Sequence, residues 1–267
     1  MEKIVSSKWL HENMEMPNLI ILDASTTFNE RTIPHARLFD LEHAFADTSS
    51  PFPNTVPQPQ QFEIECQKLG INKDSNIVVF DNKGIYTSPR VWWLFQIMGH
   101  THIAVLDGGL PDWIQNGFET STKHSKPLTK GNFQANYNKE LVVTFNQVKE
   151  NVDRQKYLIV DARSEGRFNG TAPEPRKHLK SGNIPHSVNI PYEDVLNNGK
   201  YKSRDEINKL FKNKIKDSNE LVFSCGSGIT ASIILLAGAI GYKESLRLYD
   251  GSWTEWAELN QLTTEIQ

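Results

Sequence analysis

The sequence contains only two cysteines, Cys66 and Cys225, among 267 residues. Because so few thiols cannot form a disulfide framework, we expect the protein to work in a reducing compartment, the cytoplasm. Long hydrophobic runs are also missing. Apolar stretches such as residues 233–237 are far too short to cross a membrane, and the first residues lack the apolar core of a secretion signal. These absences predict a soluble intracellular protein.

An excess of basic residues is missing as well. The chain has 29 lysines and arginines against 32 aspartates and glutamates, which gives a formal net charge of −3. Such a balance provides no general attraction to nucleic acid or to an anionic membrane surface. We therefore expect neither as a partner, and any basic residue with a role has to be identified individually.

What the chain does contain is a repeated order of motifs. Asp23 in Leu-Asp-Ala-Ser is matched by Asp161 in Val-Asp-Ala-Arg, and the Ile-Pro-His turn at residues 33–35 recurs at residues 184–186. The Asp-Gly pairs at 107–108 and 250–251 are each followed by a tryptophan at the same interval, and Asp81 falls where Cys225 falls in the second half. Matches in one consistent order indicate an internal duplication.

The fold class follows from the elements within each repeat. Short apolar stretches typical of strands alternate with helices of crossover length, which predicts an α/β domain with a mainly parallel sheet flanked by helices. We expect one domain at residues 1–120 and a second at 140–267. Residues 121–139, which are rich in Ser, Thr, Lys and Asn, form the predicted linker. Ligands of such sheets gather at the carboxyl ends of the strands, where Cys225 and Asp81 would lie.

The stretch around Cys225 has the pattern of a nucleophile on a strand-to-helix turn. An apolar strand at residues 221–224 ends at the cysteine, two glycines follow, and residues 231–241 read as an apolar helix. Such a turn aims several N–H groups at one spot, and the helix dipole adds positive charge, so the loop is expected to favour the thiolate. The alternative is a buried structural cysteine. The predicted anion cradle comprises Gly226, Ser227, Gly228, Ile229 and Thr230.

The other cysteine and the first repeat are expected to be inactive. Cys66 falls within a predicted helix at residues 61–69, away from any glycine turn, and is interpreted as a packing residue. Asp81 occupies the cysteine position of the first repeat, which therefore cannot form a thiolate there. We expect that half to have a structural role.

The second repeat has a longer segment than the first between its aspartate and its turn proline. This insert contains Arg167 and Arg176. An extra loop in the copy that carries the cysteine is a reasonable place for substrate contacts, and two arginines can hold a carboxylate. The alternative is that they form surface ion pairs with Glu165 and Glu174.

Taken together, the doubled domain, the loop at residues 225–230 and the closing Tyr-Asp-Gly-Ser-Trp at 249–253 resemble the two-domain rhodanese-type sulfurtransferases over nearly the whole chain. Within that family the loop is similar to the 3-mercaptopyruvate sulfurtransferase form, Cys-Gly-Ser-Gly-Val-Thr, with Ile229 in place of valine. The resemblance implies two rhodanese-like domains, of which the first is catalytically inactive. It also implies that Arg167 and Arg176 grip the carboxylate and keto oxygen of mercaptopyruvate.

The activity implied by the resemblance is sulfur transfer. The sulfur of 3-mercaptopyruvate would pass through a Cys225 persulfide to a thiol such as thioredoxin, or to cyanide, without a metal or organic cofactor. An alternative on the same loop is a thiosulfate sulfurtransferase, although such members typically carry basic residues where Gly226 and Ser227 stand. A non-catalytic persulfide carrier is a further alternative. A cysteine phosphatase is disfavoured, because its loop needs an arginine where this chain has Ala231.

The sequence departs from the family pattern at two places. The family usually has glycine after the turn proline, where this chain has His35 and His186. Some members also place a histidine where this chain has Asn54 and an acid where it has Glu42, and a relay through the loop serine is proposed for them. No relay through Ser227 is therefore predicted here. His178 and His186, near the insert, are expected to be exposed to solvent.

Overall fold

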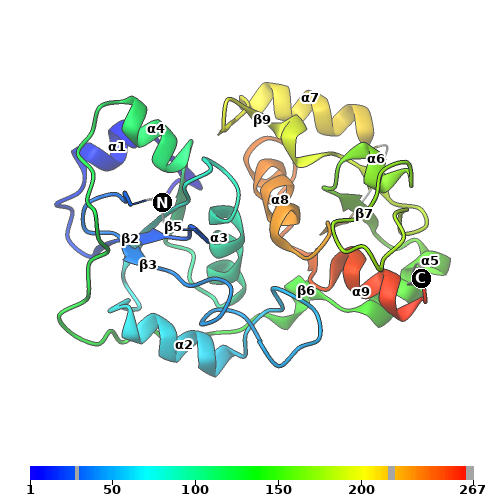
Figure 1. The fold of residues 1–267 in the computed structure, drawn as a ribbon, viewed down its shortest axis with the longest axis horizontal. Helices are drawn as coiled ribbons and strands as arrows, with labels where there is room; N and C mark the ends of the chain where they lie inside the picture. Colours follow the sequence, from blue (N-terminus) through cyan, green and yellow to red (C-terminus); the bar gives the residue numbers. More distant parts are fainter. Residues whose placement is uncertain (28–29, 216–219, 263–267) are drawn as a thin grey trace. The chain divides into compact units, whose positions relative to one another are not determined.

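The computed structural model describes residues 1–27, 30–215 and 220–262. The chain forms two compact units that largely follow the two halves of the sequence (Figure 1). Unit 1 comprises Met1–Thr48, Val56–Lys139 and Asn197–Tyr201, and unit 2 comprises Ser49–Thr55, Glu140–Leu196 and the chain from Lys202 onward. Each unit therefore includes one short segment from the opposite half of the sequence.

Each unit is built on a five-stranded sheet with the same strand order. The order is β1-β5-β4-β2-β3 in unit 1 and β6-β12-β11-β7-β8 in unit 2. The strand pairs in both sheets are parallel. The duplicated α/β fold predicted from the motif order is thereby confirmed. The strands are β1 (Ile4–Val5), β2 (Leu19–Asp23), β3 (Arg37–Leu38), β4 (Asn76–Phe80), β5 (Ile103–Leu106), β6 (Val142–Val143), β7 (Leu158–Asp161), β8 (Val188–Asn189), β11 (Leu221–Ser224) and β12 (Leu248–Tyr249).

Helices flank both sheets. Unit 1 contains α1 (Ser7–Glu12), α2 (Pro59–Lys68), α3 (Ser88–Ile97) and α4 (Gly109–Gln115). Unit 2 contains α5 (Phe145–Arg154), α6 (Glu165–Phe168), α7 (Arg204–Lys214), α8 (Ile229–Gly241) and α9 (Ser252–Leu259). The remaining elements are the 3-10 turns η1 (Lys139–Leu141) and η2 (Tyr192–Val195) and the hairpin strands β9 (Leu196–Asn197) and β10 (Lys200–Tyr201). In the described part of the chain, no helix has the length and apolar character that a membrane span requires.

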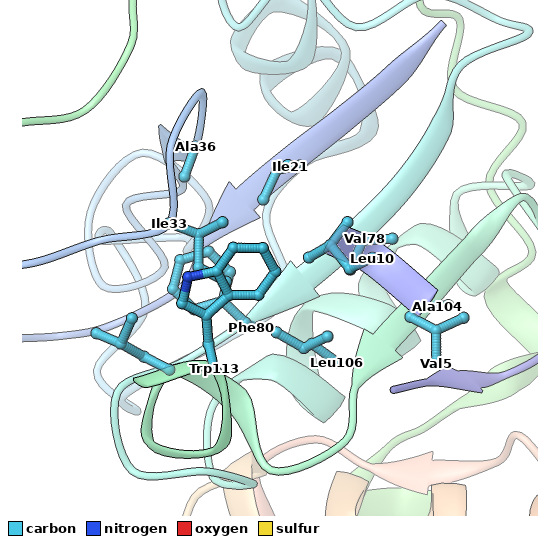
Figure 2. Packing of buried hydrophobic residues seen from close by; sticks show 11 residues of the cluster. Val5, Leu10, Ile21, Ile33, Ala36, Val78, Phe80, Ala104, Leu106 and Trp113 are labelled. Carbon is cyan, nitrogen blue, oxygen red and sulfur yellow. The ribbon is translucent and has the colours of Figure 1, made fainter. Parts of the chain in front are cut away.

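The central strand β4 explains why helices cover both faces of its sheet. Val78 and Phe80 are fully buried in a cluster that includes Leu10 of α1 and Trp113 of α4 (Figure 2). Successive side chains of a strand point to opposite faces, so the intervening Val79, which is also fully buried, packs on the other side. A strand buried on both faces holds the loop that follows it firmly in place.

That loop in unit 1 begins with Asp81, whose carboxylate is enclosed by the main chain. The side chain is 1% exposed. Its Oδ2 accepts the backbone N–H groups of Tyr86 at 2.9 Å, Thr87 at 3.0 Å and Ser88 at 3.0 Å, and the Ser88 hydroxyl at 2.7 Å. The turn after the central strand therefore forms an anion cradle in unit 1, and the Asp81 side chain fills it.

We expect Asp81→Ala to destabilise the protein by about 3 kcal/mol, because it leaves several buried donors without an acceptor. Urea denaturation measures the change. Asp74→Ala is the matched control, since Asp74 is exposed and accepts a hydrogen bond from Asn18 at the surface. It should change stability by less than about 0.5 kcal/mol. Equal losses for the two variants would contradict a structural role for the Asp81 carboxylate.

The two Ile-Pro-His turns keep the backbone conformation that favours glycine. His35 has φ +66° and His186 has φ +62°, both in the left-handed region. A histidine in this region carries local backbone strain that glycine would not. Both histidine side chains are exposed. His178 is exposed as well, and its Nε2 lies 3.2 Å from Glu258 Oε1.

Candidate active site

Cys225 directly follows β11, the strand at the centre of the sheet in unit 2. Gly228 caps the start of α8 with φ +84°, a left-handed conformation that glycine adopts without strain. This turn brings the N–H of Gly228 to 3.1 Å from Cys225 Sγ. The N-terminus of α8 points at the same region. The amide and the helix dipole both favour negative charge on the sulfur.

The loop is held from behind by the start of α9. Cys225 N–H donates to Ser252 Oγ at 3.1 Å, and its carbonyl accepts the N–H of Trp253 at 2.9 Å. The carbonyl of Gly226 accepts both the N–H and the hydroxyl of Thr254, at 3.1 and 2.7 Å. The contacts of Ser252 and Thr254 with the loop were not predicted from the sequence. The signal was present, because Ser252 lies within the closing motif and Thr254 follows it.

The two cysteines differ in their surroundings. Cys225 is 2% exposed and its sulfur contacts a backbone amide. Cys66 is fully buried within α2, as predicted for a packing residue. Burial, reinforced by the nearby Glu65 and Glu63, raises the pKa of the Cys66 thiol well above its usual value. Cys66 is therefore poorly suited to act as a nucleophile.

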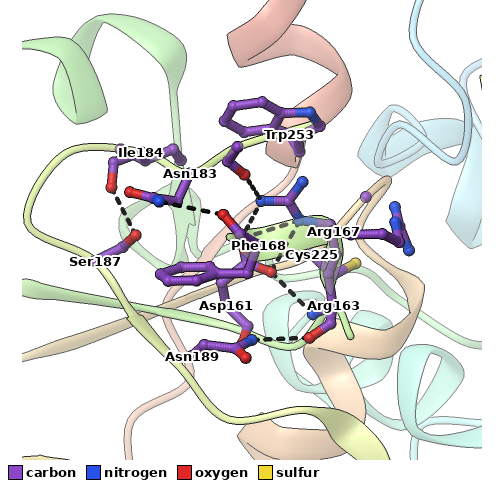
Figure 3. Close-up of polar contacts among 12 residues, drawn as sticks. Asp161, Arg163, Arg167, Phe168, Asn183, Ile184, Ser187, Asn189, Cys225 and Trp253 are labelled. Carbon is purple, nitrogen blue, oxygen red and sulfur yellow. Dashed lines mark hydrogen bonds and ion pairs between the residues drawn. The ribbon is translucent and has the colours of Figure 1, made fainter. Parts of the chain in front are cut away.

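The insert places Arg167 beside the cysteine loop. The insert forms the one-turn helix α6, and Figure 3 shows the Arg167 side chain beside Cys225. A Cβ built on Gly226 would lie 2.9 Å from Arg167 Nη2. A side chain at position 226 would therefore require the guanidinium to move. The Arg167 side chain keeps 22% of its surface exposed, so some of its donors are accessible.

Arg167 is anchored by Glu174, which the sequence suggested only as an alternative partner on the surface. Arg167 Nη2 lies 2.6 Å from Glu174 Oε2, and its Nε donates to Oε1 at 3.2 Å. The Glu174 side chain is only 2% exposed, whereas Glu165 is exposed and is not the partner. The pairing with Glu174 that was the alternative reading of Arg167 is therefore present, but the pair is largely enclosed and does not lie on the surface.

Glu174 in turn contacts Arg163, which is completely buried. Arg163 donates to both oxygens of Asp161, and its guanidinium lies 4.4 Å from the Trp253 ring (Figure 3). It also donates to Glu174 Oε1 at 2.8 Å and to the Gly182 carbonyl at 2.7 Å. Burial alone would lower the pKa of Arg163, but Asp161 and Glu174 outweigh it and raise that pKa. A permanent buried cation therefore fixes Glu174, and Glu174 fixes Arg167.

Among the described residues, no contact brings Arg176 to the loop. Its side chain is half-buried, and its carbonyl accepts the N–H of Leu179 at 2.9 Å. No carboxylate of residues 1–27, 30–215 or 220–262 lies within 4.0 Å of its guanidinium. A role for Arg176 in substrate binding stays a prediction.

Asn54 reaches the loop from the segment Ser49–Thr55, which belongs to unit 2. Its Nδ2 lies 3.1 Å from Ser227 Oγ and 3.3 Å from the Ser227 carbonyl oxygen. An amide does not take up protons near neutral pH, so this contact is not a proton relay. Within the described residues, no group of three or more histidine, cysteine or acidic side chains is arranged to hold a metal ion.

The fold and the site define a class of protein, in which an α/β domain is duplicated and only the second copy carries a cysteine on its central loop. A sequence profile described as "Rhodanese-like domain" matches residues 6–116 and 144–259. The chain belongs to this family and contains two copies of its domain.

Several known proteins are similar to the chain over most of its length. The human protein named 3-mercaptopyruvate sulfurtransferase and the rat protein named thiosulfate sulfurtransferase are each 37% identical, over 95% of this chain and 91% of theirs. The crystal structure of SseA from Escherichia coli, described as a 3-mercaptopyruvate sulfotransferase, matches with a TM-score of 0.84 and 31% identity, covering 95% of this chain and 99% of that one. Overall identity therefore does not separate the two named activities.

Proposed function

We propose that this protein is a sulfurtransferase that takes sulfur from 3-mercaptopyruvate, holds it on Cys225 as a persulfide and passes it to a thiol or to cyanide. The observation that carries the proposal is the sulfur of Cys225 at 3.1 Å from the Gly228 amide, with Arg167 beside the same loop. Relatives named for sulfur transfer support it. In this proposal residues 140–267 form the catalytic domain, residues 1–120 the inactive one and residues 121–139 the linker.

The proposed first step is attack by the Cys225 thiolate on the sulfur of 3-mercaptopyruvate. A sulfur–sulfur bond forms as the carbon–sulfur bond breaks, and the electron pair leaves on carbon to give the enolate of pyruvate. The enolate then takes a proton from solvent, while the thiol proton of the donor stays on the persulfide. The persulfide then loses that proton to solvent. In the second step the lone pair of the acceptor, a thiolate or cyanide, attacks the outer sulfur, and the electron pair of the sulfur–sulfur bond returns to Cys225 as a thiolate.

The loop of unit 1 that corresponds to the cysteine loop suggests where the transferred sulfur would lie. In the loop after β4, the amides of Tyr86 and Thr87 bind Oδ2 of Asp81, which lies one bond beyond its Cγ. The positions at the same interval from Cys225 are Thr230 and Ala231, in the first turn of α8, whose N–H groups lack a partner within the helix. The outer sulfur of a persulfide likewise lies one bond beyond Sγ. We propose that the loop from Gly226 onward cradles it as an anion.

The donor assignment rests on the charges around the loop. Gly226 and Ser227 add no positive charge next to the cysteine, which suits a substrate whose single carboxylate is held elsewhere. We propose that Arg167 and Arg176 bind the carboxylate and keto oxygen of mercaptopyruvate. Thiosulfate is the alternative donor, because the rat relative named for that activity is equally similar. The proposed cycle uses no cofactor.

Two further elements of the proposal concern the cellular setting. We propose thioredoxin as a physiological acceptor thiol and the cytoplasm as the compartment, since the chain has no framework of disulfides. Reduced thioredoxin should discharge the persulfide, and imaging of a fluorescent fusion should show cytoplasmic signal. Failure of thioredoxin to accept sulfur, or signal confined to an organelle, would overturn the corresponding element.

The test is to offer purified protein each donor in turn, with cyanide or thioredoxin as the acceptor. We expect multiple turnovers and a higher kcat/KM for 3-mercaptopyruvate than for thiosulfate. A higher value for thiosulfate would overturn the donor assignment. A single turnover per cysteine with every acceptor would instead indicate a persulfide carrier, and no sulfur transfer from either donor would overturn the proposed function.

A further inference from the structure

The contact between Asn54 and Ser227 fixes the direction of two hydrogen bonds. The same atom of the Asn54 amide, Nδ2, lies within hydrogen-bonding distance of both the carbonyl oxygen and the hydroxyl of Ser227. A carbonyl oxygen can only accept, so the group that faces it must be the NH2 of the amide. The orientation of the Asn54 side chain is therefore determined by chemistry as well as by the coordinates.

This orientation has a consequence for the hydroxyl of Ser227. An NH2 group can only donate, so Ser227 Oγ must accept from it. A serine hydroxyl has a single hydrogen, which must then point away from Asn54. In the described part of the chain no group accepts that hydrogen from Ser227. Ser227 is half-buried in the cysteine loop, one residue before the amide that contacts Cys225 Sγ.

We infer that Ser227 is a fixed hydrogen-bond donor to an anionic atom at the site, and that Asn54 is the positioning residue that sets its direction. The Ser227 hydroxyl would donate its hydrogen bond to the Cys225 thiolate, to the outer sulfur of the persulfide, or to the developing enolate oxygen of the donor. For the last two, the inference rests on the proposed function. Because the Asn54 amide neither gains nor loses a proton near neutral pH, Ser227 keeps its hydrogen and does not act as a base.

The sharpest test is Asn54→Asp, which preserves the size of the side chain and reverses the hydrogen bond. A carboxylate accepts the hydroxyl hydrogen of Ser227 and so turns it away from the site. We expect kcat/KM to fall about 10- to 100-fold, the range for a hydrogen bond to a charged group. Unchanged or higher kcat/KM would overturn the inference, because it would mean that catalysis does not need Ser227 as a hydrogen-bond donor.

Two control variants separate this effect from backbone strain. Asn54 has φ +61°, so Asn54→Gly removes the amide without introducing a strained residue, and its kcat/KM should fall less than that of Asn54→Asp. Asn18 also has φ +61°, and its Nδ2 contacts the exposed Asp74 in unit 1. Asn18→Asp should leave kcat/KM unchanged. A loss for Asn18→Asp equal to that for Asn54→Asp would overturn the assignment to Ser227.

A double-mutant comparison tests whether Asn54 acts through Ser227. In a Ser227→Ala background, Asn54→Asp should have little further effect, because the hydroxyl that it redirects is already gone. The pH profile of Ser227→Ala should retain the same ionisations as the wild type. Full additivity of the two changes, or loss of an ionisation, would contradict the inference.

The rate at which iodoacetamide alkylates Cys225 provides a readout that does not depend on sulfur transfer. Peptide mass spectrometry distinguishes Cys225 from the buried Cys66. Asn54→Asp should slow alkylation at neutral pH, since the thiolate loses a donor and gains a nearby negative charge. An unchanged rate would overturn the inference for the thiolate. A slower rate in a protein that transfers no sulfur from any donor would support the inference while refuting the proposed function.

Discussion

Cys225→Ser is expected to lower sulfur transfer from either donor by at least about a thousandfold, because it removes the nucleophile of a covalent mechanism. A serine hydroxyl stays protonated at neutral pH, and the described loop contains no basic side chain that could remove its proton. The replacement is close to isosteric at a position that is 2% exposed, so the folded structure should be retained. Steady-state assays with both donors, together with a thermal melt, measure the two quantities. Full activity of the variant would refute the mechanism.

Cys66→Ala is the matched control for this prediction. Cys66 is the other cysteine of the chain, and it packs within α2 without exposure to solvent. Its removal should cost about 1 kcal/mol of stability as a small cavity forms, and should leave turnover per folded molecule unchanged. Loss of turnover in a folded Cys66→Ala protein would show that the wrong cysteine has been assigned.

The second large effect is expected for Glu174→Ala, which should destabilise the protein by about 3–5 kcal/mol. The change leaves Arg163, whose side chain is 0% exposed, with a buried Nη1 that has lost its acceptor. It also frees Arg167 from the contact that holds it beside Gly226, so kcat/KM for 3-mercaptopyruvate should fall in the molecules that remain folded. Urea denaturation and steady-state kinetics on the same preparation measure both effects.

Two further variants make this prediction specific. Glu165→Ala removes the same charge from an exposed position of α6, and should alter stability by less than about 0.5 kcal/mol with no change in activity. Glu174→Gln keeps the shape and one acceptor oxygen, so it should lie between Glu165→Ala and Glu174→Ala. If Glu174→Ala behaves like Glu165→Ala, the buried ion pairs do not position Arg167.

The sequence was sufficient to predict the architecture, because the same elements occur twice. The recurrence of Asp23 as Asp161, and of each turn and Asp-Gly pair in the same order, indicated duplicated domains, and both five-stranded parallel sheets confirm it. The turn after the central strand was also predictable from its glycines. The one-turn helix α6 was not, because four residues carry too little periodicity to indicate a helix.

The parts of the site that were missed depend on tertiary packing. A glutamate between two arginines gives the same sequence pattern whether it is exposed or buried, so only the structure reveals that Glu174 is enclosed with Arg163. Asn54 and Ser227 are separated by 173 positions, so the sequence related them only through the family resemblance, and no local pattern can show that they form a hydrogen bond. The grouping of the segment Ser49–Thr55 with unit 2 was hidden for the same reason.

The most direct test of the account is peptide mass spectrometry after incubation with 3-mercaptopyruvate in the absence of an acceptor. We predict that the peptide containing Cys225 gains the mass of one sulfur atom, that cyanide removes it, and that the Cys66 peptide does not change. Added sulfur on Cys66, or none on Cys225 while sulfur transfer proceeds, would contradict the assignment of Cys225 as the sulfur-carrying residue.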